Sequence, residues 1–476
     1  MLTATHLKVL AVTGDLVVIE IWGETMFAFL EKLNQIVWGI PALFGIVGVG
    51  LYLTFRTGFA QVRFFPQAMK DFIGRFSGKD KGDNSGFRAL CTALAATVGT
   101  GNLAGVAGAI ALGGPGAIFW MWVCGALGMV TKFAEATLAV RYRKQSATVE
   151  FIGGPMVMME QAFGASWRPL AVLYSFFGVV AAFGVGNATQ INTILSSLDG
   201  LLVSLGGKLS VPSKGFLAAF LAVLICVMLF GGARRIGEVA ERLIPFASIA
   251  YLLLCLVVLI GRFQAIPQAF ATIFAGAFLP KAVTGGVVGS FFASLRVGAS
   301  RGVFTNEAGM GTASIAHAGA NVSHPVHQGF MGIMEVFLDT IVICTMTALV
   351  ILCSGVLVPY GTDTGILLTS QAFSSVLGDW VQIPLTLALC LFGFATVLGW
   401  GLYGARCAAF LFGENAWKLF AVLQAVVVFA SAFLQTGTVW LLAEIVNGLM
   451  ALPNLALLTA LTPELTRLVK EYKKGV

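Results

Sequence analysis

The sequence predicts an all-α membrane protein that crosses the bilayer about eleven times. Of its 476 residues, 58% are hydrophobic and only 11% are charged, whereas a soluble globular domain carries about 25% charged residues. The apolar residues gather in stretches of roughly 20, the length that a helix needs to cross a bilayer. Two stretches are interrupted by glycine and polar residues, which is typical of transporters with a binding site at the midplane.

The predicted spans follow one another with short connections. In chain order they are 37–55, 86–112, 116–141, 168–197, 215–232, 238–260, 285–316, 328–354, 381–408, 415–434 and 438–462. Four shorter segments are amphipathic and are expected to lie at the membrane surface, namely 24–36, 154–164, 264–275 and 366–377.

Lysine and arginine predict the orientation of these spans. The loop 55–88 is strongly basic, and the loops that alternate with it, together with the tail, hold Arg141, Arg143, Lys144, Arg234, Arg235, Arg467, Lys470, Lys473 and Lys474. The other loops hold only scattered cations, such as Lys208, Lys214, Arg262 and Lys281. We expect a multi-pass protein of the cell (inner) membrane, with the N-terminus outside and the C-terminus in the cytoplasm. The net charge of +7 therefore indicates topology and not nucleic-acid binding.

Other function classes find little support in the sequence. It contains no HExxH motif and no Walker loop, so neither zinc-dependent hydrolysis nor direct use of ATP is indicated. Its eight cysteines lie singly in apolar segments without a CxxC pair, which is typical of small buried side chains. A channel is a weaker alternative, because no ring of polar residues repeats along the chain. We expect neither an enzyme nor a bound cofactor.

The two interrupted spans contain "ATVGTGNLAGVAG" at 96–108 and "SLRVGASRGVFTNEAGMGTASIAHA" at 294–318. They lie five spans apart and so cross in opposite directions, which indicates an inverted repeat. Close helix packing would explain Gly101 and Gly105 but not the polar Thr100 and Asn102. Backbone freed from a helix cannot face lipid, so we expect these segments to line a binding site.

Four segments carry a resemblance to a known family. "TVGTGNLAGVAGAIALGGPGAIFWMW", "TKFAEATLAVRYR", "GGPMVMMEQAFG" and "TNEAGMGTASIAHA" resemble signature segments of the alanine or glycine:cation symporter family. The resemblance implies a leucine-transporter-like fold, with an N-terminal part over 1–84, five-helix repeats over 85–262 and 263–462, and a basic tail over 463–476. It implies a secondary symporter that imports small neutral amino acids, chiefly alanine and glycine, with Na⁺ by alternating access. Proton coupling in the same fold is the alternative.

The resemblance also assigns a substrate site. The substrate carboxylate would meet the amides around Thr100 and Gly101, where a half-helix N-terminus favours an anion. Gln190 would offer an amide hydrogen bond, and Trp400 would form a wall. The ammonium group would be held around Phe304, Thr305, Asn306 and Glu307.

A cation site is implied beside it. Its ligands would be carbonyl oxygens near Ala95 and Val98, the carbonyl of Gly393 and the hydroxyl of Thr396, and Asn102 could bridge a second ion. Such oxygen ligands suit an ion that must leave again. Val397 departs from the family pattern, because sodium-coupled relatives often have a second hydroxyl there.

Charged residues inside spans are functional candidates. Glu307 could pair with Arg301 or Arg296. Lys132 and Glu135, three residues apart, are expected to form an ion pair near the inner end of their span, and a role as an inner gate is the alternative. Glu335 and Asp339 share a helix face without an adjacent cation, which keeps proton coupling open. His317, His324 and His327 lie in a predicted inner loop and are not expected to bind a metal.

Overall fold

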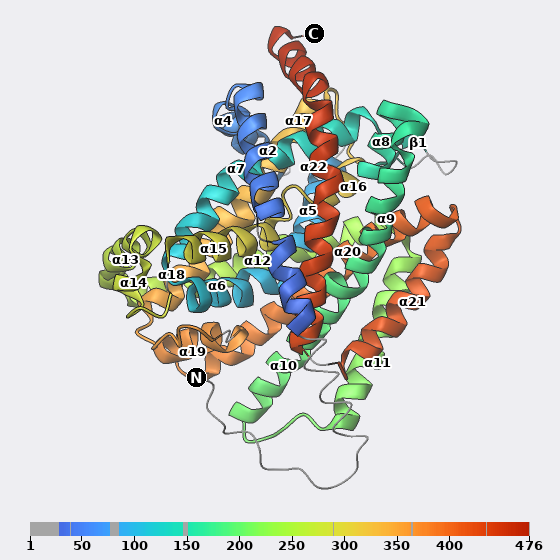
Figure 1. The fold of residues 1–476 in the computed structure, drawn as a ribbon. Helices are drawn as coiled ribbons and strands as arrows, with labels where there is room; N and C mark the ends of the chain where they lie inside the picture. Colours follow the sequence, from blue (N-terminus) through green and yellow to red (C-terminus); the bar gives the residue numbers. More distant parts are fainter. Residues whose placement is uncertain are drawn as a thin grey trace.

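The protein is described by a computed structural model that is almost entirely helical. It describes residues 28–38, 40–76, 85–145, 151–288, 290–362, 365–434 and 436–475. Two short strands, β1 (Lys144–Gln145) and β2 (Phe151–Ile152), pair antiparallel, with Lys144 opposite Ile152. All other regular elements of these ranges are helices (Figure 1).

The helices of the first half begin with residues 28–37, which are helical. They continue as α2 (Ile40–Thr57), α3 (Ala60–Arg63), α4 (Phe65–Phe76), α5 (Ser85–Thr97), α6 (Val106–Gly113), α7 (Gly116–Arg141), α8 (Pro155–Phe163), α9 (Arg168–Phe183), α10 (Thr189–Ser204), α11 (Val211–Phe230) and α12 (Gly232–Gly261). π-helical turns join α5 to α6 (Gly101–Gly105) and α9 to α10 (Gly184–Ala188).

The second half has the same character. Its helices are α13 (Ile266–Phe278), α14 (Pro280–Val283), α15 (Phe291–Asn306), α16 (Thr312–His317), α17 (Pro325–Val336), α18 (Thr345–Cys353), α19 (Ile366–Leu377), α20 (Gln382–Phe412), α21 (Ala416–Ser431) and α22 (Thr436–Lys474). A longer π-helical stretch, Phe337–Cys344, joins α17 to α18. Three-residue 3₁₀ turns precede α13 and α20, and a four-residue one, Gly164–Trp167, precedes α9.

The structure supports the predicted class of a multi-pass membrane protein. Within the described residues, eight helices are long and apolar enough to cross a membrane, and the bent pair formed by 85–97 and 101–113 makes a ninth. The other two predicted spans coincide with the interrupted helices α15 and α16 and with α21, which has only 16 residues. The total of eleven spans and the inverted repeat stay predictions.

Three of the predicted short surface segments are helices, namely α8, α13 and α19, and α19 has the predicted bounds 366–377. The fourth, 24–36, is helical from residue 28 onward, and its first residues lie outside the described ranges. The structure adds α3 and α4 within the basic loop 55–88, for which no helix was predicted. It also continues the last span as one helix through the basic tail to Lys474.

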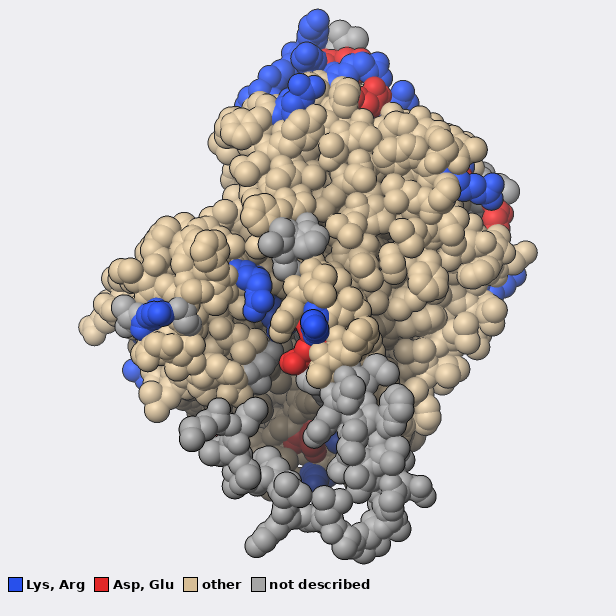
Figure 2. All heavy atoms as spheres, viewed as in Figure 1, with Lys and Arg blue, Asp and Glu red and all other residues tan. Residues whose placement is uncertain are grey.

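Charge on the molecular surface is unevenly placed. Figure 2 shows a broad flank almost free of charged side chains, and lysine and arginine gather at one end. The C-terminal end of α22 lies at that end, together with α4 and α8, while α19 and the turn between α10 and α11 lie toward the other end (Figure 1). The predicted basic loop 55–88, which contains α4, and the basic tail therefore lie at the same end of the molecule.

Glycine allows the closest helix contacts in the interior. A methyl group added to Gly332 on α17 would lie 2.5 Å from the carbonyl oxygen of Lys132 on α7. One added to Gly298 on α15 would lie 2.3 Å from the carbonyl oxygen of Ala117, also on α7. Since no real side chain fits at these distances, α7 packs backbone to backbone against both helices, in the manner of small-residue contacts in membranes.

Candidate functional site

The first interrupted span breaks where the sequence predicts. The axes of 85–97 and 101–113 differ by 53°, and the break contains Val98 and Gly99. The backbone N–H of Gly99 donates to the side-chain oxygen of Asn102 at 2.9 Å. The side chain of Asn102 thus replaces the backbone carbonyl that would accept this hydrogen bond in an unbroken helix, so the freed N–H group in the membrane keeps a partner.

The second break separates α15 from α16. Glu307 adopts a left-handed conformation with φ 55°, and Gly309 and Gly311 follow with φ of 92° and 80°. Left-handed backbone is rare for residues other than glycine, so these residues end α15 sharply. The turn is held by Glu135 of α7, whose Oε1 accepts from the N–H groups of Gly309 and Gly311 at 3.0 and 3.1 Å.

Asn454 of α22 completes the support of this turn. Its Nδ2 donates to Glu135 Oε1 at 2.8 Å and to the carbonyl oxygen of Gly309 at 2.9 Å. The interpretation of Glu135 as a partner of Lys132 is therefore wrong, because its carboxylate serves the broken backbone instead. Asn454 was missed from sequence, since a lone asparagine in the last span carries no distinguishing pattern.

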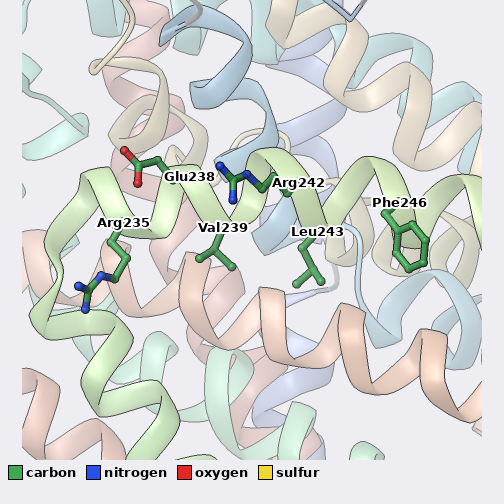
Figure 3. A pocket seen from close by; sticks show the side chains of 6 residues that line it. All are labelled: Arg235, Glu238, Val239, Arg242, Leu243 and Phe246. Atoms are coloured by element: carbon green, nitrogen blue, oxygen red, sulfur yellow. The ribbon is translucent and has the colours of Figure 1, made fainter.

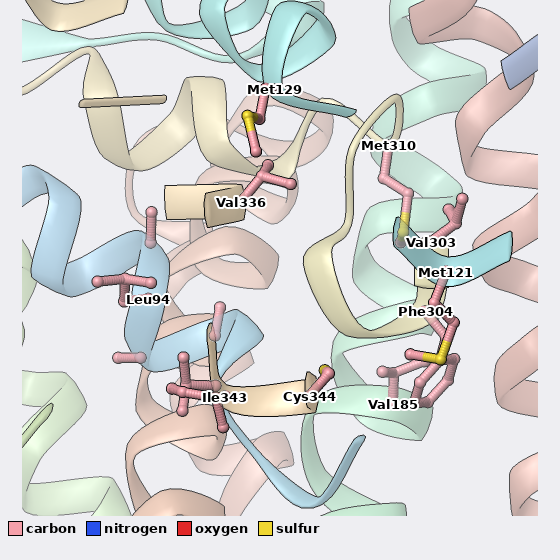
Figure 4. Close-up of a cluster of buried hydrophobic side chains, with 14 of the residues drawn as sticks. Leu94, Met121, Met129, Val185, Val303, Phe304, Met310, Val336, Ile343 and Cys344 are labelled. Atoms are coloured by element: carbon pink, nitrogen blue, oxygen red, sulfur yellow. The ribbon is translucent and has the colours of Figure 1, made fainter. Parts of the chain in front are cut away.

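The two breaks lie against each other. A methyl group added to Gly101 would lie 3.1 Å from Thr305 Cγ2 and 3.5 Å from Phe304 Cδ1. Phe304 belongs to a buried apolar cluster that includes Val185 and Met310, drawn in Figure 4. The structure thus brings together Gly101, Phe304 and Thr305, three of the predicted substrate residues, with little space between them.

Polar residues from α10 and α20 meet the other side of the first break. A methyl group added to Gly99 would lie 2.6 Å from Thr396 Oγ1 and 3.5 Å from Gln190 Oε1. In the described part of the chain, Gln190 Oε1 and the Thr100 hydroxyl are buried without a hydrogen-bond partner. Buried polar atoms without a partner are expensive, so these two point to a site built for a polar ligand.

The predicted cation ligands lie in the same place. Ala95, Val98 and Thr396 are almost fully buried, and a methyl group added to Gly393 would lie 2.8 Å from Ile194 and 3.8 Å from the carbonyl oxygen of Gln190. Thr396 Oγ1 donates to the carbonyl oxygen of Phe392 at 3.0 Å, which leaves its lone pairs for a cation. Val397 lies in a separate apolar cluster and supplies no oxygen.

Asn102 connects the first break to a carboxylate. Its Nδ2 donates to Asp339 Oδ1 at 2.6 Å, and Asp339 Oδ2 accepts from the Thr340 hydroxyl at 2.8 Å. Asn306 of the second break donates through Nδ2 to Thr340 Oγ1 at 3.0 Å. A buried polar chain therefore joins both breaks through Asp339. Sequence reasoning named Asp339 but did not place it at the site, because its partner Asn102 is 237 residues away.

Lys132 pairs with Glu335, which corrects the expectation that Glu335 has no adjacent cation. Lys132 Nζ lies 2.7 Å from Glu335 Oε1, and neither side chain has more than 1% of its surface exposed. His317 Nε2 donates to Glu335 Oε2 at 3.0 Å, and Gln328 donates to His317 Nδ1 at 2.6 Å. These residues form a buried network and not a surface ion pair. Gln328 also donates to the carbonyl oxygen of Gly86 on α5 at 3.2 Å.

His317 lies in α16 and not in a loop, and no group of histidine, cysteine or acidic residues suited to a metal ion occurs among the described residues.

The remaining predicted residues have distinct surroundings. Glu307 is buried and accepts from the Thr312 hydroxyl at 2.6 Å. Arg301, which could have paired with it, lies 3.0 Å from Glu444 on α22. Trp400 is fully buried on α20, and a methyl group added to Gly186 would lie 2.3 Å from its Cβ. The ring of Trp400 is therefore pressed against the π-helical turn before α10.

Two interrupted helices whose polar breaks meet inside a membrane bundle are typical of secondary transporters. The fold is leucine-transporter-like: the crystal structure of MhsT in complex with L-phenylalanine matches with a TM-score of 0.57 at 15% identity, over 79% of this chain and 88% of that one. The chain belongs to the sodium:alanine symporter family, whose model matches residues 23–476. It is a transporter and not an enzyme.

Curated relatives match over nearly their whole length. The sodium/alanine symporter AgcS of Methanococcus maripaludis is 39% identical over 94% of this chain and 98% of its own. An uncharacterized transporter of Haemophilus influenzae is 40% identical over 94% and 96%. The probable sodium/glutamine symporter GlnT of Bacillus subtilis is 34% identical over 93% and 89%. The family thus includes relatives named for different amino acids.

Proposed function

We propose that this protein imports small neutral amino acids, alanine and glycine above all, together with Na⁺. The observation that carries the proposal is the meeting of the two breaks, where Gly101 lies against Phe304 and Thr305 with less than one methyl group of spare space. This close approach of the two breaks favours a substrate with a small side chain.

The substrate carboxylate would bind at Thr100 and Gly101, at the positive end of the half-helix that follows the first break. Gln190 Oε1 and the Thr100 hydroxyl, which are among the buried polar atoms without a partner in the described part of the chain, would hydrogen-bond the substrate. Its ammonium group would lie toward Asn306 and Glu307, where the carboxylate of Glu307 is buried. Trp400 would close one wall.

Na⁺ would bind between α5 and α20, with oxygen ligands from Ala95, Val98, Gly393 and Thr396. A second ion would bind near Asn102, and Asp339 would supply the negative charge there. A buried carboxylate is expensive without a positive partner, and no ion pair joins Asp339 to a cation in the described part of the chain. The protein would lie in the inner membrane with the C-terminus in the cytoplasm.

Proton coupling is the second candidate, and one observation favours it. Glu135, Glu307 and Asp339 are all fully buried or nearly so, and among the described residues none forms an ion pair. A proton on Asp339 would neutralise it as a cation would. Under proton coupling, Thr396 would lose its role as a ligand and Asp339 would be the residue that titrates.

Uptake of radiolabelled alanine into proteoliposomes tests the function. We expect accumulation to follow an inward Na⁺ gradient and to increase with an inside-negative potential, since net positive charge would enter. The same vesicles with a pH gradient and choline in place of Na⁺ serve as the control. Uptake that follows the pH gradient and ignores Na⁺ would contradict sodium coupling and favour Asp339.

A further inference from the structure

One end of α12 carries a hollow that lies apart from the transport site. It is lined by Arg235, Glu238, Val239, Arg242, Leu243 and Phe246, all of them on this helix. In Figure 3 the side chains of Val239, Leu243 and Phe246 point to the same side of α12, and Glu238 and Arg242 lie along its other edge. We call this hollow the α12 groove.

The α12 groove has an excess of positive charge. Arg234 pairs with Glu238 at 3.0 Å, and Arg88 of α5 pairs with Glu241 at 3.0 Å. Of the four arginines near these two glutamates, Arg235 and Arg242 form no ion pair with another residue that the structure describes, and both are exposed. Arg235 donates a hydrogen bond to the carbonyl oxygen of Val227 at 3.3 Å.

The apolar part of the groove reaches part of the way into one lipid leaflet. Phe246 exposes 65% of its surface and lies seven residues beyond Val239 (246 − 239), about 10 Å along the helix axis. Half of the hydrocarbon core of a bilayer is about 15 Å thick. The membrane window of α12 has a mean hydropathy of 2.8, and the charged turns come before it. The groove therefore runs from the headgroup level into the acyl region.

We propose that the α12 groove binds an anionic phospholipid. Its phosphate would lie near Arg242, Arg235 would add positive charge at the end of the helix, and one acyl chain would follow Val239, Leu243 and Phe246. Exposed arginines at the membrane surface attract anionic headgroups, each by about fivefold in affinity. The inference requires only that α12 spans the membrane, and it is independent of what the protein transports. In the proposed orientation, the groove faces the cytoplasmic leaflet.

Native mass spectrometry of the purified full-length protein tests this. Phosphatidylglycerol and phosphatidylethanolamine with the same acyl chains are titrated separately, and the apparent Kd of the first bound lipid is measured. We expect at least tenfold tighter binding of phosphatidylglycerol. The double variant R235Q/R242Q should weaken that binding about 25-fold, since two contributions of about fivefold are lost.

The control variant K473Q/K474Q removes the same charge from the exposed tail and should change the Kd by less than twofold. If the double variant does not fold, Arg242→Gln alone should still weaken binding about fivefold. Equal binding of the two lipids by the wild type, or an equal loss in the control, would overturn the proposal. Displacement of the lipid by soluble glycerophosphoglycerol would show a phosphate site without lipid recognition and would overturn it as well.

Discussion

Gly101 and Gly105 lie four residues apart at the start of the same half-helix, but the space around them differs. A methyl group on Gly101 would meet Thr305 at 3.1 Å, whereas one on Gly105 would meet it at 3.9 Å, an ordinary contact. We expect Gly101→Ala to reduce the alanine-induced rise in melting temperature by at least half, and Gly105→Ala to leave it unchanged. A thermal-shift assay with and without alanine measures both.

Gly101→Leu is the harsher test. From sequence alone, this variant is predicted to keep its melting temperature and to lose only alanine binding. The contacts with Thr305 and Phe304 change that expectation. A leucine must push the two breaks apart, which costs about 1–3 kcal/mol of folding stability, so both the melting temperature and alanine binding should fall. A Gly101→Leu variant that still gains stability from alanine would remove Gly101 from the substrate site.

Thr396 is the residue on which the sodium site can be tested most directly. Loss of its hydroxyl removes one oxygen ligand, an interaction of about 1 kcal/mol. Thr396→Ala should therefore raise the Na⁺ concentration for half-maximal uptake about fivefold, with little change in which amino acids compete. Thr396→Ser keeps the hydroxyl and should behave nearly as wild type. Thr386→Ala, a buried threonine on the same helix, controls for general effects on α20.

The role of a single residue was predictable from sequence where the composition of its own segment determines the local structure. Gly99, Thr100, Gly101 and Asn102 interrupt an apolar span, and the chain does break there. The partner of Lys132 was not predictable in this way. Sequence shows only its helical neighbour Glu135, whereas its true partner Glu335 is 203 residues away and is brought to it by the packing of α17 on α7.

At the scale of elements, uniform apolar runs predicted the long helices well, and turn residues fixed the bounds of α19. The helices α3 and α4 were not predicted. The sequence of α4 mixes apolar residues with Gln67, Lys70, Asp71 and Arg75, and this composition is also typical of a basic loop. The π-helical turns have no sequence signature beyond small residues. A π-helical turn leaves some backbone N–H and C=O groups without their usual helical partners, and it forms where neighbouring helices can hydrogen-bond those groups.

The network of Lys132, Glu335 and His317 ties α7, α17 and α16 together, and it predicts a pattern of stability. Lys132→Met leaves the carboxylate of Glu335 buried with only His317, and loss of one partner of a buried pair costs about 3–5 kcal/mol. The double variant K132M/E335M should recover a large part of this loss. Lys144→Met, which breaks the half-exposed pair with Glu160, should cost less than about 1 kcal/mol.

Fluorescence-detected melting of the purified variants measures these differences. A double variant as unstable as Lys132→Met would mean that the network does not act as a charge pair, and that Lys132 contributes mainly by filling space between α7 and α17.

At the scale of the whole molecule, the size of the site should decide which amino acids compete. The family includes a relative named for glutamine and one named for alanine, so membership alone does not fix the substrate. In this chain, Gly101 lies against Thr305, and Gly186 lies against Trp400, so little space is left beside the two breaks. One missing methylene changes binding by only about 1–3 kcal/mol, so unlabelled alanine, glycine and serine should each inhibit alanine uptake. Glutamine should not inhibit uptake, because its side chain would displace Trp400 or Phe304. Lysine and glutamate should not inhibit it either, because each would bury a charge without a partner.

Competition at a tenfold excess in proteoliposomes measures this inhibition. The variant Thr396→Ala should keep the same order of competitors. Strong inhibition by glutamine would show that the breaks separate more widely in the transport cycle than in this structure, and inhibition by lysine or glutamate would contradict a neutral substrate.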